Sequence, residues 1–252
     1  MIFWVALRKE LLEQWRSYRL LIVAVVWLLF GFTSPLFAKY TPEIIKLAMP
    51  NGDEIANLVP TPTAATAVEQ YLKNIGQIGV LLALFMAMGA VAGEKDKGTA
   101  ALMLVKPMPR GVFVMAKFVA LGVTFGVGFL LASGACYYYT LLLFEALDVP
   151  SWLAANGLAL LFVLVFVALT LFCSTLSRSQ VVAGGLAFGL WMFLSATGAL
   201  PGVGEVLPGQ LTVWASKLMD GGGASWPALW VSVGLIVVAL VGAWVVLERQ
   251  EL

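Results

Sequence analysis

The residues of this chain that could do chemistry are few, and the densest group lies in segment 93–117, GEKDKGTAALMLVKPMPRGVFVMAK. Its first residues, up to Gly98 and Thr99, superficially resemble a phosphate-binding loop. Such a loop needs a lysine directly after its last glycine to reach the terminal phosphates, and then a serine or threonine for magnesium. Here Thr99 follows Gly98 directly, and an apolar run rather than a strand precedes the segment. The sequence therefore predicts a chain that is not an enzyme and does not hydrolyse nucleotide.

Few other side chains could form a catalytic or metal site. The chain has no histidine and two cysteines, Cys136 and Cys173, both inside apolar runs, where cysteine packs as a small hydrophobic residue. Zinc, haem and histidine-assisted nucleophile sites are therefore disfavoured, and we expect neither a metal nor a cofactor in this chain. The candidate acid-base carboxylates lie at the ends of apolar runs: Glu94, Asp96, Glu145, Asp148 and Glu205. This placement argues against a proton-coupled transporter and against an intramembrane enzyme.

The composition places these residues in a membrane protein. Of the 252 residues, 61% are apolar and 12% are charged, against about 45–50% and about 25% in soluble domains. A span needs about 20 mostly apolar residues whose backbone groups bond within the chain, so each span is a helix. The net charge of +1 offers nothing that attracts nucleic acid. We predict one all-α integral membrane domain over 1–252 with six spans: 20–38, 75–93, 118–143, 153–176, 181–200 and 227–247.

The distribution of basic residues predicts the orientation of the spans. With the N-terminus in the cytoplasm, eleven of the fifteen Lys and Arg residues lie on the inner side and four on the outer side. Loops rich in Lys and Arg stay in the cytoplasm. We therefore expect both termini to be cytoplasmic in a multi-pass protein of a prokaryotic plasma membrane. Segment 94–117 then forms a basic cytoplasmic hairpin between the second and third spans, which a soluble protein could grip.

Two segments outside the spans have a predicted structure of their own. Residues 1–19 form an amphipathic helix that lies in the membrane interface, although a helix packed on another protein has the same pattern. Its apolar positions recur at helical spacing: Phe3, Leu7, Leu11 and Trp15. Segment 201–226 is too apolar for a free loop and too broken by Gly and Pro to span. We expect an outer re-entrant region there, with a short helix within 207–219, that caps a cavity.

The hairpin also carries a family signature. It resembles that of ABC-2 type transporter permeases at eight positions: Glu94, Gly98, Thr99, Leu102, Leu104, Pro107, Arg110 and Lys117. The plan of the whole chain is similar as well, with an amphipathic helix, six spans, a basic hairpin and an outer re-entrant region. Within the family the chain is most similar to permeases of the multi-copper-enzyme maturation subgroup. No histidine and no methionine-rich motif supports copper as the cargo.

The resemblance implies a type V-like exporter fold in which this chain is the permease subunit and forms the translocation pathway. The full transporter would hold two ATPase subunits, with their ATP and magnesium, and two permease copies in membrane lipid, as a homodimer or a heterodimer. The eight signature residues and the N-terminal helix would seat on the ATPases and couple them to the spans. The alternative is a force-transmitting subunit that moves no substrate and acts on an extracytoplasmic partner through segment 39–74.

Three hairpin residues have predicted physical roles in this coupling. Thr99 can cap a short helix over 100–105, and Pro107 would end that helix because it lacks an N–H. Arg110 can offer a planar fork to a carboxylate on the ATPase. We expect these residues, together with Glu94 and Gly98, to act through the ATPase contact rather than through folding.

Overall fold

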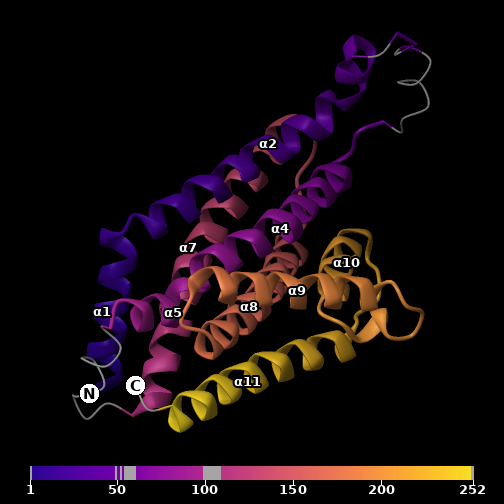
Figure 1. Ribbon diagram of the computed structural model, residues 1–252. Helices are drawn as coiled ribbons and strands as arrows, with labels where there is room; N and C mark the ends of the chain where they lie inside the picture. Colours follow the sequence, from indigo (N-terminus) through magenta and orange to yellow (C-terminus); the bar gives the residue numbers. More distant parts are fainter. Residues whose placement is uncertain (1, 49, 52, 54–60, 99–108, 251–252) are drawn as a thin grey trace.

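The computed structural model describes residues 2–48, 50–51, 53, 61–98 and 109–250, which form a bundle of helices with no strand among them (Figure 1). The long helices are α2 (Arg19–Ala48), α4 (Ala64–Ala87), α7 (Arg110–Leu143), α8 (Val149–Leu176), α9 (Gln180–Gly198) and α11 (Trp226–Arg249). The short ones are α1 (Ile2–Arg16), α5 (Gly89–Asp96), η1 (Gly204–Val206), α10 (Gly209–Lys217) and η2 (Leu218–Asp220).

Within the described residues, six helical stretches are long and apolar enough to cross a membrane, and each overlaps one of the six predicted spans. The helices extend past the apolar runs, because helix hydrogen bonding does not stop where the residues become polar. α4, for example, begins at Ala64, well before residue 75, because a capping box precedes it. Thr66 N–H donates to Thr63 Oγ1 (3.3 Å) and Thr63 N–H donates to Thr66 Oγ1 (2.9 Å).

The helices are not equally buried. In its most apolar stretch 67% of the residues of α8 are buried, against 11% for α9 and 17% for α11. α8 therefore occupies the centre of the bundle and contacts α4, α7, α9, α10 and α11. A helix as apolar as α9 cannot leave so much surface in water, so lipid or another subunit must cover it.

The indole of Trp27 joins three helices in the half of the bundle formed by α2, α4 and α7. Trp27 in α2 is fully buried and packs against Phe129 of α7 with a ring separation of 4.6 Å. Its ring lies on Gly79 of α4 and Gly128 of α7, where an added Cβ would come within 2.8 and 2.6 Å. Glycine is required at both positions to admit the indole, and a larger residue would separate the helices.

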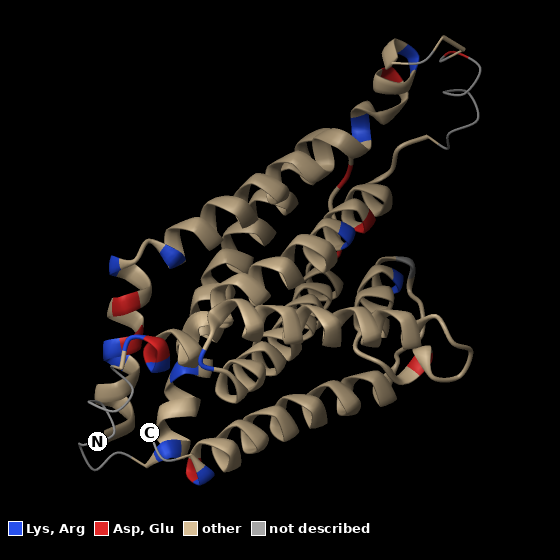
Figure 2. Ribbon diagram, in the orientation of Figure 1, with Lys and Arg blue, Asp and Glu red and all other residues tan. Residues whose placement is uncertain are grey.

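The bundle has two distinct ends (Figures 1 and 2). α1, α5 and both ends of the described chain lie at one end, here called the α1 end, and α10 lies at the opposite end. Charged residues gather at the ends, and the middle of the bundle has almost none (Figure 2). This distribution agrees with a hydrocarbon layer around the middle.

Segment 201–226 folds back at the α10 end as η1, α10 and η2, so a short helix lies within the predicted 207–219. A cavity of about 330 Å³ lies between this segment and helices α8 and α9. Its walls are mainly apolar and include Phe162, Trp191 and Pro208. Residues of this segment thus line a cavity, and its assignment to an outer re-entrant region stays a prediction.

Candidate coupling site

The structure describes four of the eight predicted coupling residues. Glu94 lies in α5, Gly98 follows its last turn, and Arg110 is the first residue of α7, with Lys117 about two turns further on. The other four, Thr99, Leu102, Leu104 and Pro107, lie outside the described residues, as does the short helix predicted over 100–105. Both ends of the predicted hairpin 94–117 therefore belong to the helices on either side of it.

The second span is interrupted at Met88, between α4 and α5, and a side chain of α8 holds the junction. The buried Ser174 hydroxyl accepts hydrogen bonds from the backbone N–H groups of Val91 (3.0 Å) and Ala92 (2.9 Å). It donates its own hydrogen to the carbonyl of Met88 (2.7 Å). One hydroxyl thus satisfies three backbone groups where the helix is interrupted, which ties α5 to the central helix.

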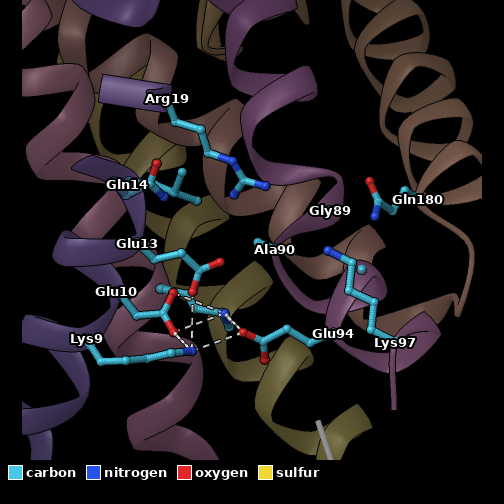
Figure 3. Close-up of a pocket in the computed structure, with 13 residues that line it drawn as sticks. Lys9, Glu10, Glu13, Gln14, Arg19, Gly89, Ala90, Glu94, Lys97 and Gln180 are labelled. Atoms are coloured by element: carbon cyan, nitrogen blue, oxygen red, sulfur yellow. Dashed lines mark hydrogen bonds and ion pairs between the residues drawn. The ribbon is translucent and has the colours of Figure 1, made fainter. Parts of the chain in front are cut away.

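A cluster of four charged residues joins α5 to α1 and α7 (Figure 3). This charged cluster consists of Lys9, Glu10, Glu94 and Lys117. The Lys117 side chain is only 3% exposed, and its ammonium lies 2.7 Å from Glu94 Oε1 and 3.1 Å from Glu10 Oε2. The Lys9 ammonium lies 3.1 Å from Glu10 and 3.3 Å from Glu94. α1, which is distant in the sequence, therefore meets α5 and α7 through one set of ion pairs.

The cluster compensates its own charges. The carboxylates of Glu10, Glu13 and Glu94 lie within 4.8 Å of one another, a spacing that could hold a metal ion. The two lysine ammonium groups already bind these carboxylates, so lysine supplies the positive charge. Burial alone would lower the pKa of Lys9, but the facing carboxylates of Glu10 and Glu94 outweigh it and raise that pKa above its usual value.

A second group of contacts joins the hairpin to the C-terminal end of α11, and we call it the C-terminal clasp (Lys95, Arg110 and Gln250). The Lys95 ammonium donates to the Gln250 side-chain oxygen (2.5 Å) and to the carbonyl of Thr175 at the end of α8 (2.6 Å). Arg110 donates to the carbonyls of Leu247 and Gln250. The Leu247 carbonyl also accepts the N–H of the C-cap residue Gln250 (3.3 Å), so Arg110 adds a second donor at this helix end. Residues on both sides of 98–109 are thus bound to α11.

Arg110 and Gly98 therefore have roles within the chain that the sequence did not indicate. The Arg110 guanidinium, which we expect to meet an ATPase carboxylate, binds the end of α11 in this structure. Gly98 ends α5 with a left-handed backbone (φ 67°), and its N–H donates to the carbonyl of Lys95 (3.1 Å). Glycine adopts this conformation without strain, so Gly98 contributes to folding. The expected action of both residues on an ATPase stays a prediction.

The N-terminal helix divides its faces differently from the sequence prediction. Leu7 is buried and Phe3 and Leu11 are partly buried, whereas Trp15 is exposed. The face turned toward α7 also carries the buried Glu10, a charged residue that does not belong to the predicted apolar positions. The reason is electrostatic: Lys117 lies in α7 and draws that carboxylate inward. The exposed apolar surface of α1 is built by a different set: Trp4, Val5, Leu12 and Trp15.

Sequence reasoning missed Lys9, Glu10, Ser174 and Gln250 as parts of this site. One signal was available, because Lys117 stands well inside the apolar stretch VFVMAKFVALG. A charge in such a stretch needs a partner of opposite charge. Glu94 and Glu10 lie in the two polar segments, 94–117 and 1–19, that were predicted on the same side of the membrane. No comparable signal marks Ser174 or Gln250, whose roles depend on how the helices pack.

Comparison with known proteins agrees with this architecture. Residues 4–252 match the family described as ABC-2 family transporter protein. The chain is 30% identical over 216 residues to "Uncharacterized transmembrane protein YxlG" of Bacillus subtilis, covering 84% of this chain and 83% of that protein. It is 28% identical over 197 residues to "Probable ABC transporter permease protein NosY" of Pseudomonas aeruginosa, covering 76% and 66%. The chain therefore belongs to the ABC-2 family of transporter proteins.

Proposed function

We propose that this chain is the permease subunit of an ATP-driven exporter whose ATP is hydrolysed by a separate ATPase subunit. Membership of the ABC-2 family and six helices that can span a membrane support the permease role. The sequence offers no phosphate-binding loop, so the energy must come from a partner. The observation that carries the coupling is that residues on both sides of 98–109 bind α1 and α11.

The two groups of contacts suggest how movement would spread. A partner that displaces the hairpin would move the start of α7 and the end of α5 together. The charged cluster would carry that displacement to α1, and the C-terminal clasp would carry it to α11 and to the end of α8. In this proposal the α1 end is cytoplasmic, which the excess of Lys and Arg there favours.

We place the translocation pathway on the face formed by α4 and α9, where a second permease copy would complete it. A groove of about 460 Å³ runs between α4, α9 and α10, and polar side chains of Gln77 and Ser195 are exposed in it. Polar groups on a membrane-spanning helix face protein or water rather than lipid. The exposed apolar surface of α9 is a surface that a second copy would cover.

The pathway proposal can be tested by cross-linking. Ser195→Cys in a cysteine-free chain should form a disulfide with a second permease copy in native membranes under mild oxidation. Val25→Cys, exposed on α2 away from this face, is the control and should stay monomeric. Cross-linking at Val25 but not at Ser195 would place the subunit contact elsewhere.

The force-transmitting alternative also has an observation in its favour. α2 continues to Ala48, beyond the predicted end of the first span at residue 38, and projects from the bundle (Figure 1). Three apolar side chains of this projection are exposed: Tyr40, Ile44 and Leu47. A partner outside the membrane could bind there. Transport by the reconstituted complex in vesicles distinguishes the two functions, because only the exporter moves a substrate.

A further inference from the structure

A cavity of about 360 Å³ opens at the α1 end between α1, α5 and the start of α9 (Figure 3). Its walls carry four positive and three negative side chains. On one wall the carboxylates of Glu10, Glu13 and Glu94 are bound by the ammonium groups of Lys9 and Lys117. The negative charge on this wall of the cavity is therefore largely neutralised by the two lysines beside it.

The positive charge of the opposite wall is not neutralised. Arg19, the first residue of α2, and Lys97, just after α5, line the cavity, and their side chains have no hydrogen bond or ion pair with any residue that the structure describes. Figure 3 shows both side chains directed into the space between α1 and α5. Two cations that converge on one cavity repel each other unless an anion lies between them.

Two amide side chains complete the polar wall. Gln14 is 5% exposed, and its buried Oε1 has no hydrogen-bond partner among the described residues. Gln14 also lines the cavity, and the NH₂ group of its amide can donate to an acceptor there. The Gln180 amide lies against α5, where an added Cβ at Gly89 or Gly93 would come within 2.9 or 2.6 Å of it. These two glycines make room for Gln180 beside the cavity.

The cavity lies at the level where phospholipid headgroups are expected, because it is at the ends of two helical stretches long enough to span a membrane. Arg19 and Lys97 stand at the ends of two membrane-spanning stretches, and basic pockets between such helices bind anionic headgroups. Next to the polar wall the surface is apolar and exposed, at Ile22 in α2 and at Val181 and Val182 in α9. A ligand with a phosphate group and acyl chains matches both surfaces, whereas a soluble phosphate matches only the first.

We infer that this cavity binds the phosphate group of an anionic phospholipid. Arg19 and Lys97 supply the charge, and the amides of Gln14 and Gln180 supply hydrogen bonds. The bound phosphate would lie next to the charged cluster, so the lipid would hold α1 against α5 at the coupling site. The inference does not depend on the proposed transport function.

The test uses the full chain, purified in a neutral detergent and freed of lipid, with its thermal unfolding followed by tryptophan fluorescence. Three probes are titrated separately: dihexanoyl-phosphatidylglycerol, dihexanoyl-phosphatidylcholine and inorganic phosphate. Each is added to the native chain, to the variant R19Q/K97Q and to the matched control R8Q/R249Q. The control removes two exposed positive charges at the same end of the bundle that do not line the cavity.

We expect phosphatidylglycerol to raise the unfolding midpoint of the native chain more than phosphatidylcholine does. Its half-saturating concentration should rise about 25-fold in R19Q/K97Q, at about fivefold for each charge, and stay within about twofold in R8Q/R249Q. The single variant K97Q, altered at an exposed side chain, should show a fivefold rise even if the double variant does not fold. The site would be overturned if the two lipids raised the unfolding midpoint equally, or if the half-saturating concentration of phosphatidylglycerol rose equally in both double variants. Equal protection by inorganic phosphate would overturn its assignment to a lipid.

Discussion

Replacement of Lys117 by glutamine is the sharpest perturbation of the coupling site, because one ammonium binds carboxylates from two other helices. In Lys117→Gln the Glu10 and Glu94 side chains, 8% and 13% exposed, would face each other with only Lys9 between them. Removing one partner of a buried ion pair costs about 3–5 kcal/mol, since the remaining charge stays buried without compensation. We expect the free energy of unfolding to fall by about 3 kcal/mol, the lower limit of that range, because Lys9 still binds both carboxylates.

The free energy of unfolding can be measured by titrating the purified chain from mild detergent into a denaturing one. Lys73→Gln is the matched control, because Lys73 pairs with Glu69 on an exposed helix surface and such pairs contribute about 0–1 kcal/mol. Glu10→Gln combined with Lys117→Gln should cost less than the two single changes together, by about 1 kcal/mol or more. A Lys117→Gln chain as stable as the Lys73→Gln chain would refute the role given to the charged cluster.

Three further predictions concern the backbone of the site and its orientation. Gly98→Ala should destabilise the chain by about 1 kcal/mol, because alanine is strained at a left-handed φ, whereas Gly126→Ala, in open space inside α7, should be neutral or stabilising in the same unfolding titration. Ser174→Ala should cost about 1–3 kcal/mol there and speed hydrogen exchange at Val91 and Ala92, whose N–H groups would lose their acceptor; unchanged exchange would contradict the role of its hydroxyl. In intact cells that express a cysteine-free chain, the cysteine of Ser225→Cys should react with an impermeant thiol reagent added outside, and that of Arg8→Cys should not. The reverse pattern would invert the proposed topology.

The spans could be predicted from the sequence because their cause is local. A run of about 20 apolar residues has no place in water, and inside lipid it can only be helical. The ends of the helices were harder to predict from the sequence, because they depend on caps and turns. Thr63 and Thr66 start α4 well before its apolar run, and Gly98 ends α5 through its backbone conformation.

The segment of the candidate coupling site was chosen from the sequence, but the contacts of its side chains could not be predicted from it. The basic residues between the second and third spans marked the segment, yet a charge pattern does not reveal which partner each side chain meets. The contact of Arg110 with the end of α11 was not predicted, and its expected contact with an ATPase stays a prediction. Glu10 is not one of the predicted apolar positions of the N-terminal helix, yet it lies buried against Lys117. Both outcomes depend on how distant helices pack, which no spacing within one segment encodes.

The rate of ATP hydrolysis tests the central claim most directly. It should be measured for the purified chain alone and for the chain reconstituted with an ABC ATPase subunit that copurifies with it, in the native form and with Arg110→Glu. The account predicts no hydrolysis by the chain alone, hydrolysis by the complex, and a loss of the permease's influence on that rate in Arg110→Glu, although the variant still inserts into the membrane. Robust hydrolysis by the chain alone, or an unchanged rate and unchanged assembly in Arg110→Glu, would contradict it.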